Sequence, residues 1–128
     1  MNILDENIIE NQRELLRSWR IHVRQVGHDI AHKGISDEEI ISLLHRMPRP
    51  TFFTGDLGFY ARPLCHANYG LVCLAVSKYD TAFFIRRFLR HSGFGRKSKR
   101  LGCVFLVGQT GIRFGCLRGG PEEAVGWK

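Results

Sequence analysis

Short apolar runs along the chain alternate with segments in which apolar residues recur at helical spacing. The run Thr51–Thr54 predicts a short strand, and its two adjacent phenylalanines indicate burial on both faces, as in a parallel sheet. The longest apolar run, Leu71–Val76, predicts the middle strand of that sheet. Further strands are expected at residues 1–4 and 20–26, and a hairpin with a Gly-containing turn is expected over 101–117.

Three segments between these strands show the spacing of amphipathic helices. The clearest begins with a capping box at Ser36–Glu39, after which apolar residues recur on one face from residue 40 to residue 47. The other two helices are expected over 8–19 and 81–91. The resulting order β-α-β-α-β-β-α-β-β predicts an α/β three-layer sandwich with a largely parallel central sheet and a C-terminal antiparallel hairpin.

The length of 128 residues and the ordinary apolar content predict one domain with a proper core. We expect residues 1–118 to form that domain and residues 119–128 to be a flexible tail. No apolar run approaches the ~20 residues of a membrane span, so we expect no membrane contact and a cytoplasmic location. Cys73 and Cys103 lie in apolar runs and are expected to be reduced core residues, because no C-x-x-C spacing indicates a zinc site or redox motif.

The net charge of +7 is divided unevenly along the chain. Residues 1–60 hold 7 Lys or Arg against 9 Asp or Glu, giving −2, and residues 61–128 hold 12 against 3, giving +9. This division is consistent with an acidic metal pocket beside a phosphate-binding surface, although a basic pI by itself is common in small proteins. The basic residues predicted to contact nucleic acid are Arg86, Arg87, Arg90, Arg96, Lys97, Lys99 and Arg100.

Three acidic side chains occupy places where sites form in α/β sheets. Asp5 follows the first apolar run, Asp56 follows Thr51–Thr54 after one glycine, and Asp37 opens the second helix. Ligands bind beyond the carboxyl ends of the strands in open α/β sheets, and carboxylates are ligands of hard divalent cations. We therefore predict that these three acids converge on such a cation. Simpler roles stay open: Asp5 or Asn7 as a helix N-cap, and Asp37 as an ordinary acid in a first helical turn.

Three segments of the chain carry recognisable motifs. They are Ile3–Asn7 at the start, Gly34–Ile40 at the second helix, and Phe53–Phe59 after the third strand. Together they resemble the PIN-like ribonucleases, specifically the small branch related to VapC-type toxins. The order and spacing of the motifs are similar to those of the family over residues 1–76, whereas the basic C-terminal half matches only loosely.

The resemblance implies a metal-dependent endoribonuclease with a PIN-like fold. The family acids correspond to Asp5, Asp37 and Asp56, which would hold Mg²⁺ or Mn²⁺ with several waters, and Glu6 or Glu39 could supply a further ligand through water. The metal would activate a water and stabilise charge on the phosphate during in-line attack. Relatives are frequently toxins held inactive by a small antitoxin, so the partners to consider are RNA, an antitoxin and a second copy of the chain.

Two other functions are compatible with the sequence. Gly58 stands where the family pattern often has a second acid, which favours a non-catalytic module that binds RNA or a protein on the same fold. A flavodoxin-like or receiver-like domain would bind Mg²⁺ and accept a phosphoryl group, with Asp5 and Glu6 as its acid pair and Lys78 after a late strand. The receiver-like interpretation ranks last because no helix is predicted between the third and fourth strands.

Overall fold

The computed structural model describes residues 1–127 as an α/β fold built on one mixed sheet. Its three α-helices have nine residues each, and among the described residues no helix is long and apolar enough to cross a membrane. The elements are β1 (Asn2–Leu4), α1 (Glu10–Ser18), β2 (Arg24–Gln25), α2 (Asp37–His45), β3 (Thr51–Thr54), the 3-10 turns η1 (Leu57–Phe59) and η2 (Arg62–Leu64), β4 (Gly70–Leu74), α3 (Thr81–Leu89), the 3-10 turn η3 (Lys97–Lys99), β5 (Cys103–Val107), β6 (Gly111–Cys116) and β7 (Glu123–Gly126).

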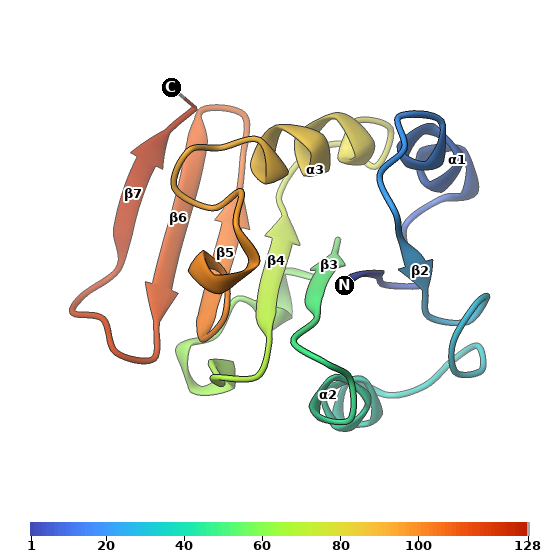
Figure 1. Cartoon of the computed structure of the whole chain (residues 1–128), viewed down its shortest axis with the longest axis horizontal. Helices are drawn as coiled ribbons and strands as arrows, with labels where there is room; N and C mark the ends of the chain where they lie inside the picture. The colour runs from blue at the N-terminus through green and yellow to red at the C-terminus, as the bar shows by residue number, and fades with distance from the viewer. Residues whose placement is uncertain (128) are drawn as a thin grey trace.

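The strands are arranged in the order β2-β1-β3-β4-β5-β6-β7. The first five of these pair in parallel, and β6 and β7 are added by antiparallel pairing. In Figure 1 the arrows of β4 and β5 point toward the end of the molecule where α1 and α3 lie, and β6 runs the other way. The predictions of an α/β class, a largely parallel sheet and a C-terminal antiparallel hairpin are confirmed.

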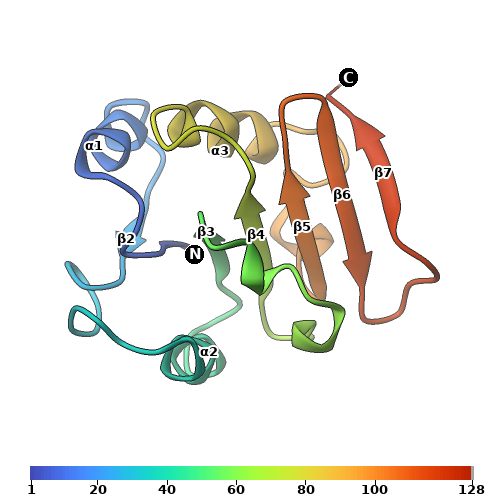
Figure 2. The same cartoon turned by 180° about the vertical axis from the view of Figure 1, so that it is seen from behind.

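Alternate residues of the central strands enter two apolar clusters on opposite faces of the sheet. Phe53 belongs to the cluster that contains α1 and α3, whereas Phe52 belongs to the cluster that contains α2. Both rings are fully buried, as the adjacent phenylalanines predicted. Helices α1 and α3 contact each other and lie together at one end of both views, while α2 lies at the other end (Figures 1 and 2).

The helices begin in different ways. The predicted capping box of α2 is confirmed, because Glu39 N donates to Ser36 Oγ at 3.2 Å and Ser36 N donates to Glu39 Oε1 at 3.1 Å. At the start of α3, Asp80 makes no side-chain capping bond. Instead, the N–H of Ala82 donates to Oε1 of the buried Gln12 at 2.9 Å. This capping contact joins α1 to α3 across 70 residues of sequence.

The strand predicted over residues 20–26 is largely wrong, because only Arg24–Gln25 pairs with β1. Arg20 has a φ of 62°, which turns the chain sharply after α1. Ile21 and Val23 then pack with the apolar cluster beneath the helices rather than in a sheet ladder. Val23 is buried and Ile21 is half-buried in this cluster, as the alternation suggested, although neither residue belongs to a strand.

The segment from residue 119 onward differs from the flexible tail that was predicted. Glu123–Gly126 forms β7 on the edge of the sheet, and residue 128 lies outside the described residues. Side chains from distant segments hold this part of the chain: the Tyr60 hydroxyl donates to Glu122, and Arg62 Nη2 donates to the Gly119 carbonyl at 2.8 Å. The local sequence is polar and Gly-rich, so these long-range contacts gave no local signal.

Cys103 and Cys116 face each other across the β5–β6 pair and form a disulfide with an S–S distance of 2.03 Å. The prediction that Cys103 remains a reduced core residue is wrong, since its partner lies on the returning strand of the hairpin. Cys73 is free and buried, as predicted. Burial raises the pKa of the Cys73 thiol to about 12, so it stays protonated at neutral pH.

Candidate functional site

Asp5 and Asp56 follow two adjacent parallel strands at the same edge of the sheet. Leu4 of β1 is paired with Phe53 of β3, and Asp5 N continues the ladder by donating to the Phe53 carbonyl at 2.8 Å. Asp56 comes two residues after Thr54, the last residue of β3. Both acids therefore lie beyond the carboxyl ends of their strands, the usual place for a ligand site in an open α/β sheet.

Thr54 connects these two acidic residues, a role that the sequence analysis missed. Its hydroxyl donates to Asp5 Oδ2 at 2.6 Å and accepts from Asp56 N at 2.9 Å. The other oxygen of the same carboxylate, Asp5 Oδ1, accepts from Glu6 N at 2.8 Å. A threonine two residues before an acid at a strand end is the sequence signal that could have found it. These bonds fix the orientation of the buried Asp5 carboxylate.

Neither residue proposed as an alternative helix cap has that role. Helix α1 has Ile9 at its N-cap position, without a side-chain capping bond. Asp5 bonds Glu6 and Thr54 as described, and Asn7 Oδ1 accepts from Gly55 N at 3.3 Å. Asn7 thereby links the loop after β1 to the loop after β3, directly beside Asp56.

The acids at this edge interact through their charges. Burial raises the pKa of the Asp5 carboxyl; the hydrogen bonds from Thr54 and Glu6 lower it, and the negative charges of Asp37 and Asp56 raise it further. Asp37 and Asp56 therefore lie close enough to Asp5 to act on its charge. Among residues 1–127, no Lys, Arg or His forms an ion pair with any of these three acids. Within this part of the chain, their negative charge is not compensated by an ion pair.

The donor chemistry of this edge fits a hard cation. Mg²⁺ accepts oxygen ligands, keeps several of its waters and is usually held through one or two carboxylates. Asp5 and Asp56 offer two carboxylates at one edge of the sheet, and each carboxylate has acceptor capacity beyond its protein hydrogen bonds. Within the described chain, no group of three His, Cys, Asp or Glu is arranged to hold a metal ion.

Glu6 positions the segment that carries Asp37. Its Oε1 accepts from Gly34 N at 2.7 Å, which fixes the loop in front of α2. Gly34 has a φ of 81°, a conformation that a residue with a side chain adopts only under strain. One carboxylate oxygen of Glu6, which was predicted as a metal ligand, therefore accepts a hydrogen bond from the backbone. Asp37 itself is exposed at the first position of α2.

Gly58 contributes a backbone amide to the site in place of a second acid. Its N–H donates to Asp56 Oδ1 at 2.9 Å, so that Asp56 caps the 3-10 turn η1. A Cβ at position 58 would lie 3.0 Å from the same oxygen, closer than ordinary van der Waals contact. Glycine here therefore allows η1 to approach the Asp56 carboxylate and hold it by one bond.

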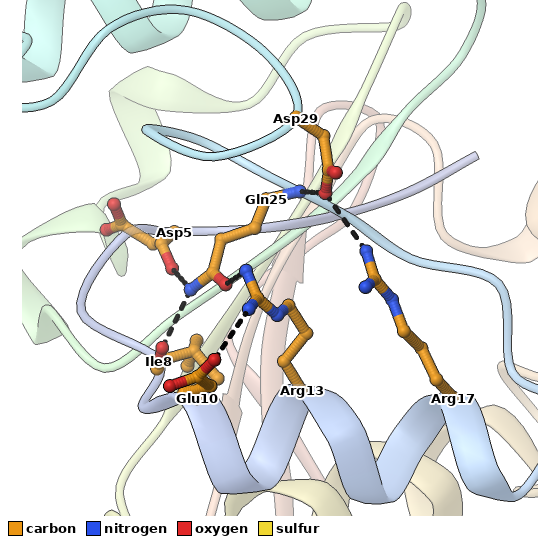
Figure 3. Close-up of polar contacts among 7 residues, drawn as sticks. All are labelled: Asp5, Ile8, Glu10, Arg13, Arg17, Gln25 and Asp29. Atoms are coloured by element: carbon orange, nitrogen blue, oxygen red, sulfur yellow. Dashed lines mark hydrogen bonds and ion pairs between the residues drawn. The ribbon is translucent and has the colours of Figure 1, made fainter.

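A buried glutamine, also missed by the sequence analysis, supports the backbone of the site (Figure 3). Gln25 Nε2 donates to the carbonyls of Asp5 at 3.0 Å and Ile8 at 2.7 Å. Its Oε1 accepts from Arg13 Nη1 at 3.1 Å, and its backbone N–H donates to Asp29 Oδ2 at 2.9 Å. The available signal was a polar residue at an inward-facing position of an otherwise β-branched run.

The seven basic residues predicted to contact nucleic acid separate into three groups. Arg86, Arg87 and Arg90 lie on α3 or at its C-cap. Arg96, Lys97 and Lys99 are exposed and lie in and around η3. The pKa of the Met1 ammonium group is lowered first by burial and then by the positive charge of Lys97. Since Met1 precedes β1, we place this group at the amino edge of the sheet, opposite the acids. The third group is Arg100 alone.

Arg100 is a buried structural residue, which differs from the surface role predicted for it. Its Nε donates to Thr51 Oγ1 at 2.9 Å, and its Nη1 donates to the carbonyls of Phe94 at 2.9 Å and Gly95 at 3.0 Å. Only 5% of the residue is exposed. These bonds stabilise the amino edge of β3, and they leave few N–H groups of the Arg100 guanidinium available to bind a phosphate.

A pocket of about 210 Å³ lies at the carboxyl edge, lined by neighbours of the acids in sequence but not by the acids themselves. Gly55 and Asn7 form the part of its wall next to Asp56, and Lys78 and Thr81 bring the loop before α3 to the other side. Its apolar lining consists of Ile8, Leu74 and Val76. The pocket therefore connects the acidic edge to the start of α3.

Comparison of the chain with protein-family models, with curated proteins and with solved structures finds no match.

Proposed function

We propose that this protein is a metal-dependent endoribonuclease of the PIN-like type. The observation that carries the proposal is the placement of Asp5 and Asp56 beyond adjacent strand ends, joined by the Thr54 hydroxyl, with Asp37 near enough to act on the Asp5 charge. Within residues 1–127, none of these three acids forms an ion pair. Like charges gathered in this way favour the binding of a divalent counter-ion. Apolar clusters on both faces of the sheet are consistent with the three-layer PIN-like arrangement.

Each residue has a defined part in this proposal. Bound Mg²⁺ or Mn²⁺ would supply charge stabilisation for in-line attack at an RNA phosphate. Asp5 and Asp56 would hold the ion, and Thr54 would keep the Asp5 carboxylate in orientation. Glu6 would position Asp37 through its bond to Gly34. A small antitoxin that covers this edge would keep such an enzyme inactive until it is removed.

A cleavage assay tests the proposal directly. Single-stranded and structured RNA would be incubated with the wild type in Mg²⁺, Mn²⁺ or EDTA, beside Asp56→Asn and the matched control Glu123→Gln, an exposed acid on β7. We expect metal-dependent cleavage by the wild type and the control, and none by Asp56→Asn. Cleavage that persists in EDTA or in Asp56→Asn would contradict the proposal.

Metal binding offers a second readout that does not depend on activity. A divalent ion that binds only the folded state raises the unfolding free energy by about 2.7 kcal/mol at one hundred times its Kd. We expect Mn²⁺ to raise the melting temperature of the wild type and to have a much smaller effect on Asp5→Asn. Equal stabilisation of both proteins would place the ion elsewhere.

Gly58 supports the alternative of a non-catalytic RNA- or protein-binding module. In such a module the acidic edge would be a remnant, and the basic residues would bind RNA without cutting it. Salt-sensitive RNA binding by the wild type, with no cleavage in any metal, would favour this alternative over the nuclease.

The strand order favours the receiver-like interpretation more than the sequence did. The order β2-β1-β3-β4-β5 is that of flavodoxin-like sheets, and Lys78 faces the same pocket as Gly55. Against it, β3 and β4 are joined by the short turns η1 and η2 rather than an α-helix. Incubation with acetyl phosphate and Mg²⁺ would decide, since only a receiver-like domain would gain one phosphoryl group at Asp56 by mass spectrometry.

A further inference from the structure

We propose that α3 and the loop before it form a binding surface for unpaired nucleotides, with Tyr79 and Phe83 as base-stacking rings and Arg87 and Arg90 as phosphate ligands. The inference rests on the proposed ribonuclease function and names its substrate as single-stranded RNA. The four residues follow one another at positions 79, 83, 87 and 90, a spacing that places them along one side of a helix and its entry.

Two aromatic rings are exposed on this surface. Tyr79 is 62% exposed and Phe83 is 47% exposed, whereas the neighbouring Phe84 is buried in the core. Phe83 meets the Phe84 ring edge to face at a centroid distance of 5.2 Å, so the exposed ring is supported from below. The Lys78 ammonium lies 5.3 Å from the centroid of Tyr79. An exposed, supported ring beside a cation is the arrangement that stacks a nucleic-acid base.

Two arginines of α3, Arg86 and Arg87, are held in place by aromatic rings rather than by carboxylates. The Arg87 guanidinium lies 4.7 Å from the centroid of Trp127, whose Nε1 donates to the Gly108 carbonyl at 2.9 Å. The Arg86 guanidinium lies 3.7 Å from the centroid of Trp19. Stacking orients a guanidinium while its N–H groups remain available for hydrogen bonds.

These N–H groups have no protein partner in the described chain. Among residues 1–127, the side chains of Arg86, Arg87 and Arg90 make no hydrogen bond or ion pair, whereas Arg17 on α1 is paired with Asp29. An oriented guanidinium without a carboxylate is suited to a phosphate oxygen.

The surface leads to the acidic edge. Lys78 and Thr81, at the start of α3, line the same pocket as Asn7 and Gly55, and Gly55 directly precedes Asp56. Helix α3 packs on one face of the sheet, and its first residues lie near the end toward which the arrow of β4 points in Figure 1. A strand bound along α3 would therefore reach the acids through the pocket.

The charge of the surface favours a nucleic acid over a protein partner. Residues 78–90 contain 4 Lys or Arg against 1 Asp, a net charge of +3. Each exposed ring has a cation beside it: the Lys78 ammonium lies 5.3 Å from the Tyr79 centroid, and the Arg87 guanidinium lies 6.0 Å from the Phe83 centroid. Protein interfaces, by contrast, are depleted of charged residues at their centre. The proposal therefore commits to an anionic polymer that carries flat bases.

Binding would be measured by fluorescence anisotropy in EDTA, so that no cleavage is needed. The probes are a labelled single-stranded RNA oligonucleotide, the same length of abasic strand, and an RNA duplex. The proteins are the wild type, Tyr79→Leu, Phe83→Leu, Phe83→Tyr and Leu117→Ala, which changes an exposed apolar residue far along the chain and serves as the control. Each substitution is at an exposed position, and melting curves would verify the fold.

We expect each leucine variant to bind the single strand about 5- to 150-fold more weakly, the range for loss of one stacked base. Phe83→Tyr and Leu117→Ala should bind like the wild type, and the abasic strand should bind all five proteins alike. Arg87→Gln should weaken binding to both strands. The leucine at position 83 keeps apolar area but removes the ring, which separates stacking from general apolar contact.

Three results would overturn the proposal. The first is unchanged single-strand binding by both leucine variants, and the second is binding of duplex and single strand with equal affinity. The third is a dimer in light scattering that Phe83→Asp dissociates while RNA binding is unchanged, which would assign the surface to a second copy of the chain. Ring-dependent binding without cleavage would refute the nuclease but not this surface, and cleavage with ring-independent binding would refute the surface alone.

Discussion

The two ends of the sheet differ in whether their acidic side chains are paired with a cation. At the β1–β3 end, Asp5, Asp37 and Asp56 form no ion pair among residues 1–127. The polar groups around Asp5 hold its backbone and orient its carboxylate without neutralising it. At the β6–β7 end, Arg113 pairs with Glu122 at 3.5 Å, and a disulfide joins β5 to β6. In the first region, repulsion between carboxylates destabilises the folded protein, and a bound cation can relieve it. In the second region, the ion pair and the disulfide stabilise the fold. This contrast is the reason for assigning function to the first region.

The largest expected effect comes from Gln25, the buried support of the acidic end. Gln25→Leu removes the partner of the Ile8 carbonyl and of Arg13 Nη1. Each buried group left without a partner costs about 1–3 kcal/mol, so we expect a loss of about 2–6 kcal/mol in the free energy of unfolding. Urea denaturation would measure it, with Arg24→Ala at the exposed neighbouring position as the control. A loss below 1 kcal/mol would mean that the hydrogen bonds of Gln25 do not stabilise the acidic end of the sheet.

The next effect tests the opposite end. Reduction of the Cys103–Cys116 disulfide, which spans 13 residues of sequence, should lower the unfolding free energy by about 3 kcal/mol. The measurement is denaturation with and without dithiothreitol, and the double variant Cys103→Ser, Cys116→Ser should not respond to the reductant. Because the disulfide is remote from the acids, metal binding should be preserved. Loss of metal binding on reduction would contradict the claim that the two ends of the sheet are independent.

A smaller effect is expected at the loop before α2. Glu6→Ala removes the 2.7 Å bond to Gly34 N, and because this bond is exposed we expect a loss of about 1 kcal/mol in global stability. Hydrogen exchange at residues 31–36 should accelerate much more than exchange in β4. Glu123→Ala serves as the control, and unchanged exchange in the loop would show that Glu6 does not position Asp37.

The smallest effect concerns the pH dependence of stability. Because burial raises the pKa of Asp5 in the folded state above its unfolded value, the protonated form is favoured by folding. The stabilising effect is complete below the unfolded pKa of about 3.9 and is lost as pH rises through the raised folded pKa. Asp5→Asn replaces one of the two acceptor oxygens by a donor, so its stability at a single pH also reports a lost hydrogen bond. In EDTA the variant should lack this pH dependence, and its stability relative to the wild type should therefore rise with pH above about 4. A difference that stays constant over that range would contradict the uncompensated charge.

Local patterns in the sequence predicted what local physics determines. The capping box at Ser36, the burial of Phe52 and Phe53 and the antiparallel hairpin follow from residue type and spacing within a few positions. The placement of Asp5 and Asp56 beyond neighbouring strands also followed, because strand ends in a parallel sheet share one edge. The convergence of the three acids on one ion stays a prediction.

What could not be predicted depends on contacts between segments far apart in the chain. Gln12 caps α3 across 70 residues, Arg100 bonds Thr51 across 49, and Tyr60 bonds Glu122 across 62. A side chain whose partner is this distant has no periodic signal of its own. For the same reason, a basic run at Arg96–Arg100 suggested one surface, while the fold turned its last member inward.

Strand β7 protects the molecule from self-association through its sheet. Without it, the six residues of β6 would present a row of free N–H and C=O groups beside the apolar Ile112 and Phe114, a template for pairing with another chain. β7 covers that row with only four residues, all exposed and beginning with a glutamate. The strand at the opposite edge of the sheet is β2, which is only two residues long. Both boundary strands are short, and short edge strands offer few free N–H and C=O groups to another chain.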